Sequence, residues 1–286
     1  MEVIETAEKM QRASEAFRQA DRKIALVPTM GFFHEGHLEL MRVARKHSDI
    51  LIISIFVNPT QFGPGEDFNQ YPMDPEGDLM KAREVGVDVV FMPSSEDMYP
   101  KGYQTSVQVE KVTDHLCGLS RPAHFNGVTT VVAKLFNITK PHLAVFGQKD
   151  YQQLTVISRM VMDLNIDIQI LGVPTVREGD GLAMSSRNSY LSVEERKSAL
   201  CLKKSLDLAV YIFRRGERSS EAVKHAIEDM IRNHPFTHID YISLCDPVTL
   251  EEAETLGEET LLALAVRVGK TRLIDNCVLR VRAKIT

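Results

Sequence analysis

Residues 23–57 read KIALVPTMGFFHEGHLELMRVARKHSDILIISIFV, and this stretch decides the fold. An apolar strand at 23–27 precedes a polar loop, a helical segment at 37–47 and a β-branched run at 49–57. Such an unbroken apolar run is typical of a strand buried on both faces. Two apolar strands separated by a helix indicate a βαβ unit and hence a parallel sheet.

The same alternation extends over residues 1–176. Apolar spacing predicts helices at 3–20, 78–85, 112–116, 128–138 and 150–164, with strands at 88–92, 142–147 and 166–173. We therefore expect an α/β domain over residues 1–176, with helices on both faces of a parallel sheet.

The pattern changes after residue 176. A polar loop, REGDGLAMSSRNSYLS, is followed by helices at 193–214 and 219–233. Strands are predicted at 238–244, 260–268 and 271–275, with a possible fourth at 277–281. Helices followed by sequential strands are typical of an α+β domain. We expect this smaller domain to span residues 177–286.

Composition excludes several classes of protein. The 286 residues carry a net charge of −5, which argues against nucleic acid or an anionic membrane as partner. No apolar run approaches the ~20 residues of a membrane span, and the first residues lack a signal-peptide pattern. The scattered cysteines, with no CxxC motif, indicate free thiols in a reducing compartment. A cytoplasmic location is expected.

Four polar clusters follow the ends of predicted strands, at 28–37, 58–72, 146–150 and 174–188. The carboxyl ends of parallel strands lie at one edge of a sheet, where open α/β sheets bind their ligands. The clusters should therefore contribute to a ligand site at that edge.

In the first cluster, His34 and His37 enter a helix three positions apart and face the same way. A helix start attracts anions, and Gly31 and Gly36 permit close backbone approach, so a phosphate site is one interpretation. A metal site is another, although the spacing is not HExxH and no third ligand is obvious. Two surface histidines at a helix start remain a third.

The other clusters are equally open when taken alone. Lys149 could neutralise a phosphate, while Asp150 and Gln153 could simply cap a helix. The loop Met184-Ser185-Ser186-Arg187 could close over a triphosphate or could link two domains.

Single polar residues allow similar alternatives. Asn58 and Gln61 could bind hydroxyl or carboxylate groups, or could stabilise a turn. Arg121 could bind an anion or form a surface salt bridge.

Taken together, the motifs resemble the pantothenate synthetase (pantoate–β-alanine ligase) family over essentially the full chain. The matching strings are PTMGFFHEGH, SIFVNPTQFGPGEDFNQYP, RPAHFNGV, FGQKDYQQL, GLAMSSRNSYLS and KTRLIDN. One departure is Ala123, where the family usually has glycine.

The resemblance implies a Rossmann-like nucleotide- and pantoate-binding domain and a C-terminal lid domain. It implies an ATP-dependent ligase of pantothenate biosynthesis that joins (R)-pantoate to β-alanine through a pantoyl-adenylate intermediate and releases AMP and pyrophosphate. Magnesium accompanies the ATP, and the family is usually homodimeric. The magnesium ligands are not specified.

The resemblance also implies roles for individual residues. His37 is the family's proton donor, and we interpret His37 and His34 as catalytic stabilisers of the α-phosphoryl transition state. The ATP-binding residues are Met30, Gly31, Phe32, Phe33, His34, Glu35, Gly36, His37, Gly147, Gln148, Lys149, Asp150, Val176, Met184, Ser185, Ser186 and Arg187. Gln61 and Gln153 hold pantoate, and Gln61 also lies beside β-alanine. Further candidates are Asn58, together with Tyr71 for the second substrate, Asp78 for magnesium and Arg121 for the phosphates.

Two other functions fit the same motifs. A nucleotidyltransferase would retain AMP in its product, whereas the ligase releases it. A nucleotide-binding sensor would bind ATP without turnover.

Overall fold

The chain, described by a computed structural model over residues 1–281, divides into two compact units. The first unit comprises Met1–Thr113, Cys117–Gln148 and Gln153–Val176. The second comprises Asp114–Leu116, Lys149–Gln152 and the residues from Arg177 onward. Residues 282–286, which the expected C-terminal domain includes, lie outside the described residues.

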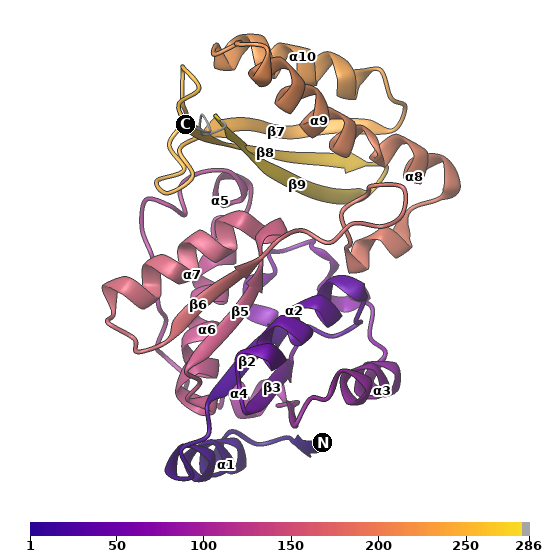
Figure 1. Ribbon diagram of the computed structural model, residues 1–286. Coiled ribbons are helices and arrows are strands. Elements are labelled where there is room, and N and C mark those ends of the chain that lie inside the picture. The colour runs from indigo at the N-terminus through magenta and orange to yellow at the C-terminus, as the bar shows by residue number, and fades with distance from the viewer. Residues whose placement is uncertain (282–286) are drawn as a thin grey trace. The chain divides into compact units, whose positions relative to one another are not determined.

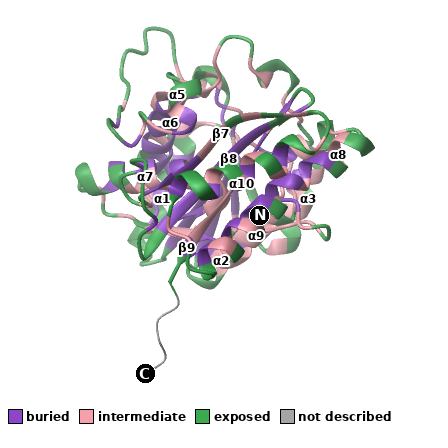
Figure 2. Cartoon of the chain, turned by 90° about the horizontal axis from the view of Figure 1, so that it is seen from above, coloured by how far each residue is buried: buried purple, intermediate pink, exposed green. Residues whose placement is uncertain are grey.

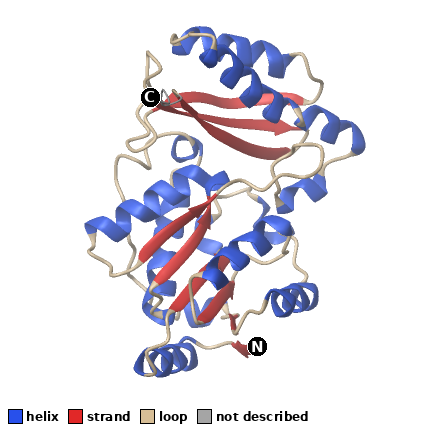
Figure 3. Ribbon diagram, viewed as in Figure 1, coloured by secondary structure: helices blue, strands red, loops and turns tan. Residues whose placement is uncertain are grey.

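The first unit is built on a six-stranded sheet in the order β1-β4-β3-β2-β5-β6. All five neighbouring pairs are parallel. The strands are β1 (Glu2–Ile4), β2 (Ile24–Thr29), β3 (Ile50–Ile55), β4 (Val89–Phe91), β5 (Leu143–Gly147) and β6 (Gln169–Val173). The predicted α/β class with a parallel sheet is confirmed (Figures 1 and 3).

Helices cover both faces of this sheet. The α-helices are α1 (Ala7–Gln19), α2 (Glu35–Lys46), α3 (Pro75–Val85), α4 (Ser95–Met98), α5 (Cys117–Ser120), α6 (His124–Thr139) and α7 (Tyr151–Asp163). Short 3-10 helices are η1 (Pro59–Gln61), η2 (Asp67–Gln70) and η3 (Gln148–Asp150). Val27 and Ile53 pack with Met41 of α2 and Ala82 of α3 on one face. On the other face, Leu26 is fully buried, and α6 contacts both β2 and α1. Most residues of α6 are buried (Figure 2).

The second unit holds a three-stranded antiparallel sheet in the order β7-β8-β9. Its strands are β7 (Thr237–Cys245), β8 (Glu259–Val268) and β9 (Thr271–Arg280). Its helices are η4 (Ser186–Tyr190), α8 (Val193–Ala199), α9 (Cys201–Arg214) and α10 (Ser220–Arg232). The apolar sides of α9 and α10 pack on the sheet around Leu206, Ile227 and Leu264. The predicted α+β class of this part is confirmed.

Five predicted elements differ from the structure. The helix expected at 3–20 begins only at Ala7, because Glu2–Ile4 pairs with β4 as a strand. No helix forms at 112–116, where Leu116 has a left-handed φ of 48°. The helix expected at 193–214 is two helices, since Leu200 donates its N–H to Ser198 O and interrupts the helical pattern. The strands at 271–275 and 277–281 are one strand, β9, paired with β8 throughout.

Within residues 1–281, no helix is long and apolar enough to cross a membrane.

Candidate active site

The strand order reverses at β2 in the first unit. The chain continues from β2 to β3 on one side, while β5 pairs with β2 on the other side. Ligands of open α/β sheets bind beside the carboxyl ends of strands at such a reversal. The residues that leave these two strands are the segment from Met30 to His37 and the pair Gly147 and Gln148. The structure therefore brings two of the polar clusters to one functional edge.

Asp78 holds the turn between β2 and α2. Its carboxylate accepts the backbone N–H of Phe32 at 2.7 Å and that of Phe33 at 2.6 Å. Gly31 and Phe32 have φ values of 85° and 53°, in the left-handed region. Burial raises the pKa of Asp78, and the two N–H donors oppose this shift without cancelling it. Asp78, expected as a magnesium contact, has its oxygens engaged by the backbone, which favours a positioning role.

His34 and His37 form a stacked pair at the start of α2. Their ring centroids are 4.1 Å apart and their planes differ by 29°. Nδ1 of His34 accepts from Gly36 N at 3.2 Å, and Nδ1 of His37 accepts from His34 N at 3.4 Å. A neutral imidazole that accepts at Nδ1 carries its proton on Nε2. Both rings then have an Nε2–H donor at a helix N-terminus, where the helix also favours an anion. Glu35 forms an ion pair with Arg42.

Gln61 lies in η1 after β3, in a closely packed setting. Its side-chain Oε1 accepts from Asn58 Nδ2 at 3.2 Å, and its Nε2 contacts Met30 Sδ at 3.1 Å. Asn58 is almost fully buried and accepts from Tyr99 OH at 2.8 Å. Since Asn58 occupies the amide oxygen, Gln61 is oriented with its NH₂ group toward Met30. Such a group can donate to a carboxylate or a hydroxyl.

The RPAHFNG segment fixes the backbone of Gln61. Its carbonyl oxygen lies 3.2 Å from Arg121 NH2 and 2.8 Å from His124 Nδ1. A Cβ on Gly127 would lie 2.4 Å from Thr60 O, so only glycine fits this approach of α6 to η1. This segment therefore contributes to the site by positioning Gln61.

Arg121 is paired with a carboxylate that the sequence did not suggest. It donates to Glu66 at 2.7 and 2.6 Å, and the side chains are 18% and 26% exposed. Burial raises the pKa of Glu66, but the hydrogen bond and charge of Arg121 outweigh burial and hold the pKa below its ordinary value. Of the two open interpretations, the structure favours the salt bridge. Tyr71 follows η2 and packs edge-on against Phe62 at 6.2 Å.

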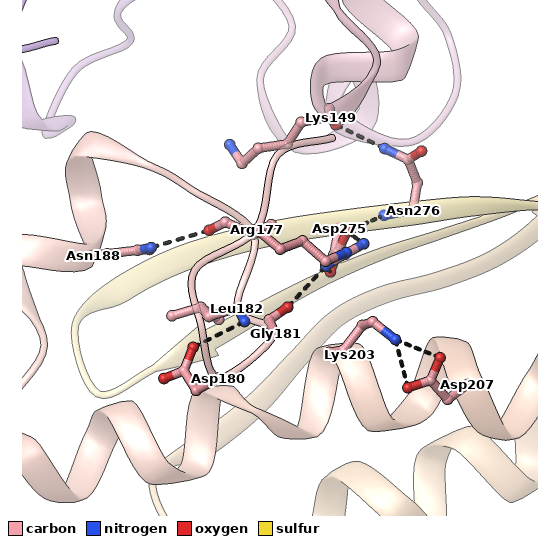
Figure 4. Close-up of polar contacts among 11 residues, drawn as sticks. Lys149, Arg177, Asp180, Gly181, Leu182, Asn188, Lys203, Asp207, Asp275 and Asn276 are labelled. Carbon is pink, nitrogen blue, oxygen red and sulfur yellow. Dashed lines mark hydrogen bonds and ion pairs between the residues drawn. The ribbon is translucent and has the colours of Figure 1, made fainter. Parts of the chain in front are cut away.

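The remaining candidates before residue 177 are divided between the units. Gln153, on the first turn of α7, and Val176 belong to the first unit. Lys149 and Asp150, in η3, belong to the second. Asn276 of β9 donates from Nδ2 to Lys149 O at 2.7 Å, which fixes the main chain there (Figure 4).

Met184 and Ser185 lie in the loop before η4, Ser186 and Arg187 are the first residues of η4, and hydrogen bonds brace this segment. Arg187 donates its N–H to Ser185 Oγ at 3.3 Å. Asn188 Nδ2 lies 2.6 Å from Glu178 Oε1 and 3.0 Å from Ala183 O. The Gly/Ser-rich pattern predicts a loop throughout, whereas the structure forms the 3-10 helix η4 from Ser186 to Tyr190.

A protein cage for magnesium is absent from residues 1–281. No group of three or more His, Cys, Asp or Glu side chains there could hold a metal ion. The metal-site interpretation of His34 and His37 gains no support from this arrangement, because no third ligand joins them.

Comparisons with known proteins agree with these observations. The family model described as pantoate-beta-alanine ligase matches residues 2–278. Pantothenate synthetase of Geotalea uraniireducens (strain Rf4) is 60% identical over 279 residues, 98% of this chain and 99% of that protein.

Solved structures give the same result. The crystal structure of pantothenate synthetase from Thermus thermophilus has a TM-score of 0.93 and 43% identity, covering 98% of this chain and 100% of that one. Pantoate-beta-alanine ligase from Francisella tularensis, complexed with beta-gamma ATP and beta-alanine, has a TM-score of 0.79 and 33% identity, covering 97% of each chain.

The sheet is parallel, and its strand order reverses at β2, beside the histidine pair at the start of α2. Together with the relatives above, this arrangement defines an α/β ligase. The chain belongs to the pantoate-beta-alanine ligase family.

Proposed function

We propose that this protein catalyses the ATP-dependent condensation of (R)-pantoate with β-alanine to pantothenate, with release of AMP and pyrophosphate. The observation that carries this proposal is the pairing of His34 and His37 at the start of α2, directly after β2. The relative complexed with beta-gamma ATP and beta-alanine supports the choice of substrates.

The first step forms pantoyl adenylate. A carboxylate oxygen of pantoate attacks the α-phosphorus of ATP, and the bond from that phosphorus to the bridging oxygen breaks as pyrophosphate leaves. Negative charge grows on the phosphoryl oxygens in the transition state. The Nε2–H groups of His34 and His37 suit hydrogen bonding to such oxygens, and Lys149 and Arg187 supply positive charge.

The second step forms the amide. The amine of β-alanine attacks the activated acyl carbon, the bond from that carbon to the phosphate oxygen breaks, and AMP leaves while the amine loses a proton. Gln61 and Gln153 are assigned to pantoate, with Gln61 also beside β-alanine. The NH₂ group of Gln61, which Asn58 orients, supports this assignment.

The proposed ATP contacts involve both the phosphate-and-ribose end and the adenine end of the nucleotide. We assign Met30–His37, Gly147–Asp150 and Met184–Arg187 to the phosphates and ribose of ATP, and the backbone of Val176 to adenine. Mg²⁺ usually keeps several waters and binds through substrate phosphates. We therefore propose that magnesium arrives with ATP, in accord with the lack of a protein cage within residues 1–281.

We further propose a cytoplasmic homodimer without nucleic-acid or membrane partners. None of Cys117, Cys201, Cys245 and Cys277 is in a disulfide bond, which fits a reducing compartment. Analytical ultracentrifugation tests the dimer.

Two measurements test the activity. Purified protein should exchange labelled pyrophosphate into ATP only when pantoate is present, and should release AMP when β-alanine is added. Intact ATP binding without exchange contradicts the ligase and favours a sensor. Retention of AMP in the product favours a nucleotidyltransferase.

A further inference from the structure

The KTRLIDN segment lies in β9 from its second residue, Thr271, onward, and includes two consecutive polar residues, Asp275 and Asn276, which have different partners. Successive side chains of a strand point to opposite sides. Asp275 binds Arg177, whereas Asn276 binds the main chain at Lys149 (Figure 4). All four residues belong to the second unit.

The Arg177–Asp275 contact is a two-pronged ion pair. Its N···O distances are 2.7 and 2.9 Å, and the Asp275 side chain is 2% exposed. Arg177 also donates to Gly181 O at 3.1 Å and forms a β-bridge with Ala183. A carboxylate buried in β9 thus anchors the loop that leads to Met184.

The Asn276 contact fixes the backbone that bears Lys149. Nδ2 of Asn276 donates to Lys149 O at 2.7 Å, and the backbone N–H of Asn276 donates to Asp275 Oδ1 at 2.9 Å. The Asp275 carboxylate therefore joins the two anchors. Figure 4 shows the Lys149 side chain directed away from the Asn276 amide, and no carboxylate within residues 1–281 pairs with its ammonium.

We propose that Asn276 is a positioning residue for Lys149. Asp275 and Asn276 together anchor two segments to β9, the main chain at Lys149 and the segment that leads from Arg177 to Met184–Arg187. A lysine ammonium is a point charge on a flexible stem. Its position therefore depends on a fixed main chain. The inference rests on the proposed function, because the anion assigned to Lys149 is the triphosphate.

Loss of the Asn276 contact should affect the adenylation half-reaction selectively. Lys149 is assigned to a phosphate that departs as pyrophosphate, so it acts in adenylation and not in the attack of β-alanine on preformed pantoyl adenylate. A residue that works through Lys149 must show the same selectivity. A residue that only stabilises the second unit would lower both half-reactions together.

The test uses a double-mutant cycle of Asn276→Ala and Lys149→Ala. Asn276→Ala should lower pantoate-dependent pyrophosphate exchange about tenfold, near the upper end for one hydrogen bond. The single-turnover rate of β-alanine with preformed pantoyl adenylate should change less than about twofold. In the Lys149→Ala background, the added Asn276→Ala change should also cost less than about twofold, because coupled residues are not additive.

Two further variants complete the experiment. Asn276→Leu has a similar volume but no donor and should match Asn276→Ala, while Asn233→Ala, exposed at the end of α10, should behave as wild type. Equal loss in both half-reactions, full additivity with Lys149→Ala, or failure of both Asn276 variants to fold overturns the inference alone. Absence of exchange in the wild type overturns the proposed function and this inference with it.

Discussion

The carboxylate of Asp78 lies 2.6 Å from the backbone nitrogen of Phe33, and this bond joins α3 to the turn that leads into the histidine pair. Phe32, next in the turn, has a left-handed φ of 53°, which costs a non-glycine residue about 1–2 kcal/mol. Hydrogen bonds to an ionised acceptor are strong enough to offset that cost. A Cβ on Gly31 would lie 2.9 Å from Asp78 Oδ2, so this turn and Asp78 require each other.

Asp78→Asn should therefore weaken the turn. An amide can accept only one of the two N–H groups and sets its own NH₂ against the other, leaving a buried donor unpaired. We expect a loss of about 1–3 kcal/mol in the free energy of unfolding, together with slower pyrophosphate exchange. Urea denaturation measures the first effect. Asp74→Asn is the matched control, because Asn caps a helix start as well as Asp does. Equal behaviour of the two variants would refute the role of Asp78.

His37→Ala should leave the fold intact and slow adenylation by roughly 10²–10³, the scale for one transition-state donor. The reason is the loss of the Nε2–H donor that we assign to the phosphoryl oxygens, while His34 keeps its own cap bond to Gly36. Pre-steady-state formation of pantoyl adenylate measures this rate. His47→Ala, at the exposed end of the same helix, should retain wild-type rates. Near-native turnover of the His37→Ala variant would contradict the proposed role of His37 in adenylation.

The fold was predictable where the sequence pattern is local. The strand–helix–strand period of residues 23–57 gave the parallel sheet, since each buried strand there is an unbroken apolar run. The strand Glu2–Ile4 was not predictable, because Ile4 continues the apolar spacing of α1 and pairs with β4 only in the folded chain. The predicted short helix at 112–116 is wrong because a left-handed residue, Leu116, stands where the spacing suggested regular helix.

The candidate site divides in the same way. His34, Gln61 and Lys149 stand in recognisable strings beside strand ends, so the sequence marks them as candidates. The partners that orient them lie far along the chain: Asp78 is 45 residues from Phe33, and Asn276 is 127 from Lys149. No periodicity reports such pairings. The available signal was the pair of polar residues Asp275 and Asn276, which stand where one predicted strand ends and the next begins.

The Arg121–Glu66 pair should make stability depend on pH. The pKa of Glu66 is held below its ordinary value of 4.5, so the pair contributes fully above that value and is lost as the pH falls through the lower, folded-state pKa. Glu66→Gln lacks the pair at every pH and should be less stable by about 1–2 kcal/mol at pH 7. This difference should shrink as the pH falls below 4.5. Unfolding curves of both proteins across that range measure it. A difference that stays constant with pH would show that the pair does not titrate as described.

Gly127→Ala should affect the binding of pantoate more than the fold. The added Cβ would lie 2.4 Å from Thr60 O and 2.6 Å from Gln61 N, so η1 must move. Overpacking of this kind costs about 1–3 kcal/mol of stability, and a displacement of about 1 Å in a positioning group can cost up to 10²-fold in rate. We expect the KM for pantoate to rise about tenfold while the KM for ATP changes little, because Gln61 is assigned to pantoate and not to ATP. Steady-state kinetics with each substrate varied in turn measure both constants.

Gly257→Ala, where the new Cβ meets only Glu259 O at 3.8 Å, is the matched control. An equal rise in both KM values would mean that α6 supports the whole edge of the sheet and does not specifically position Gln61.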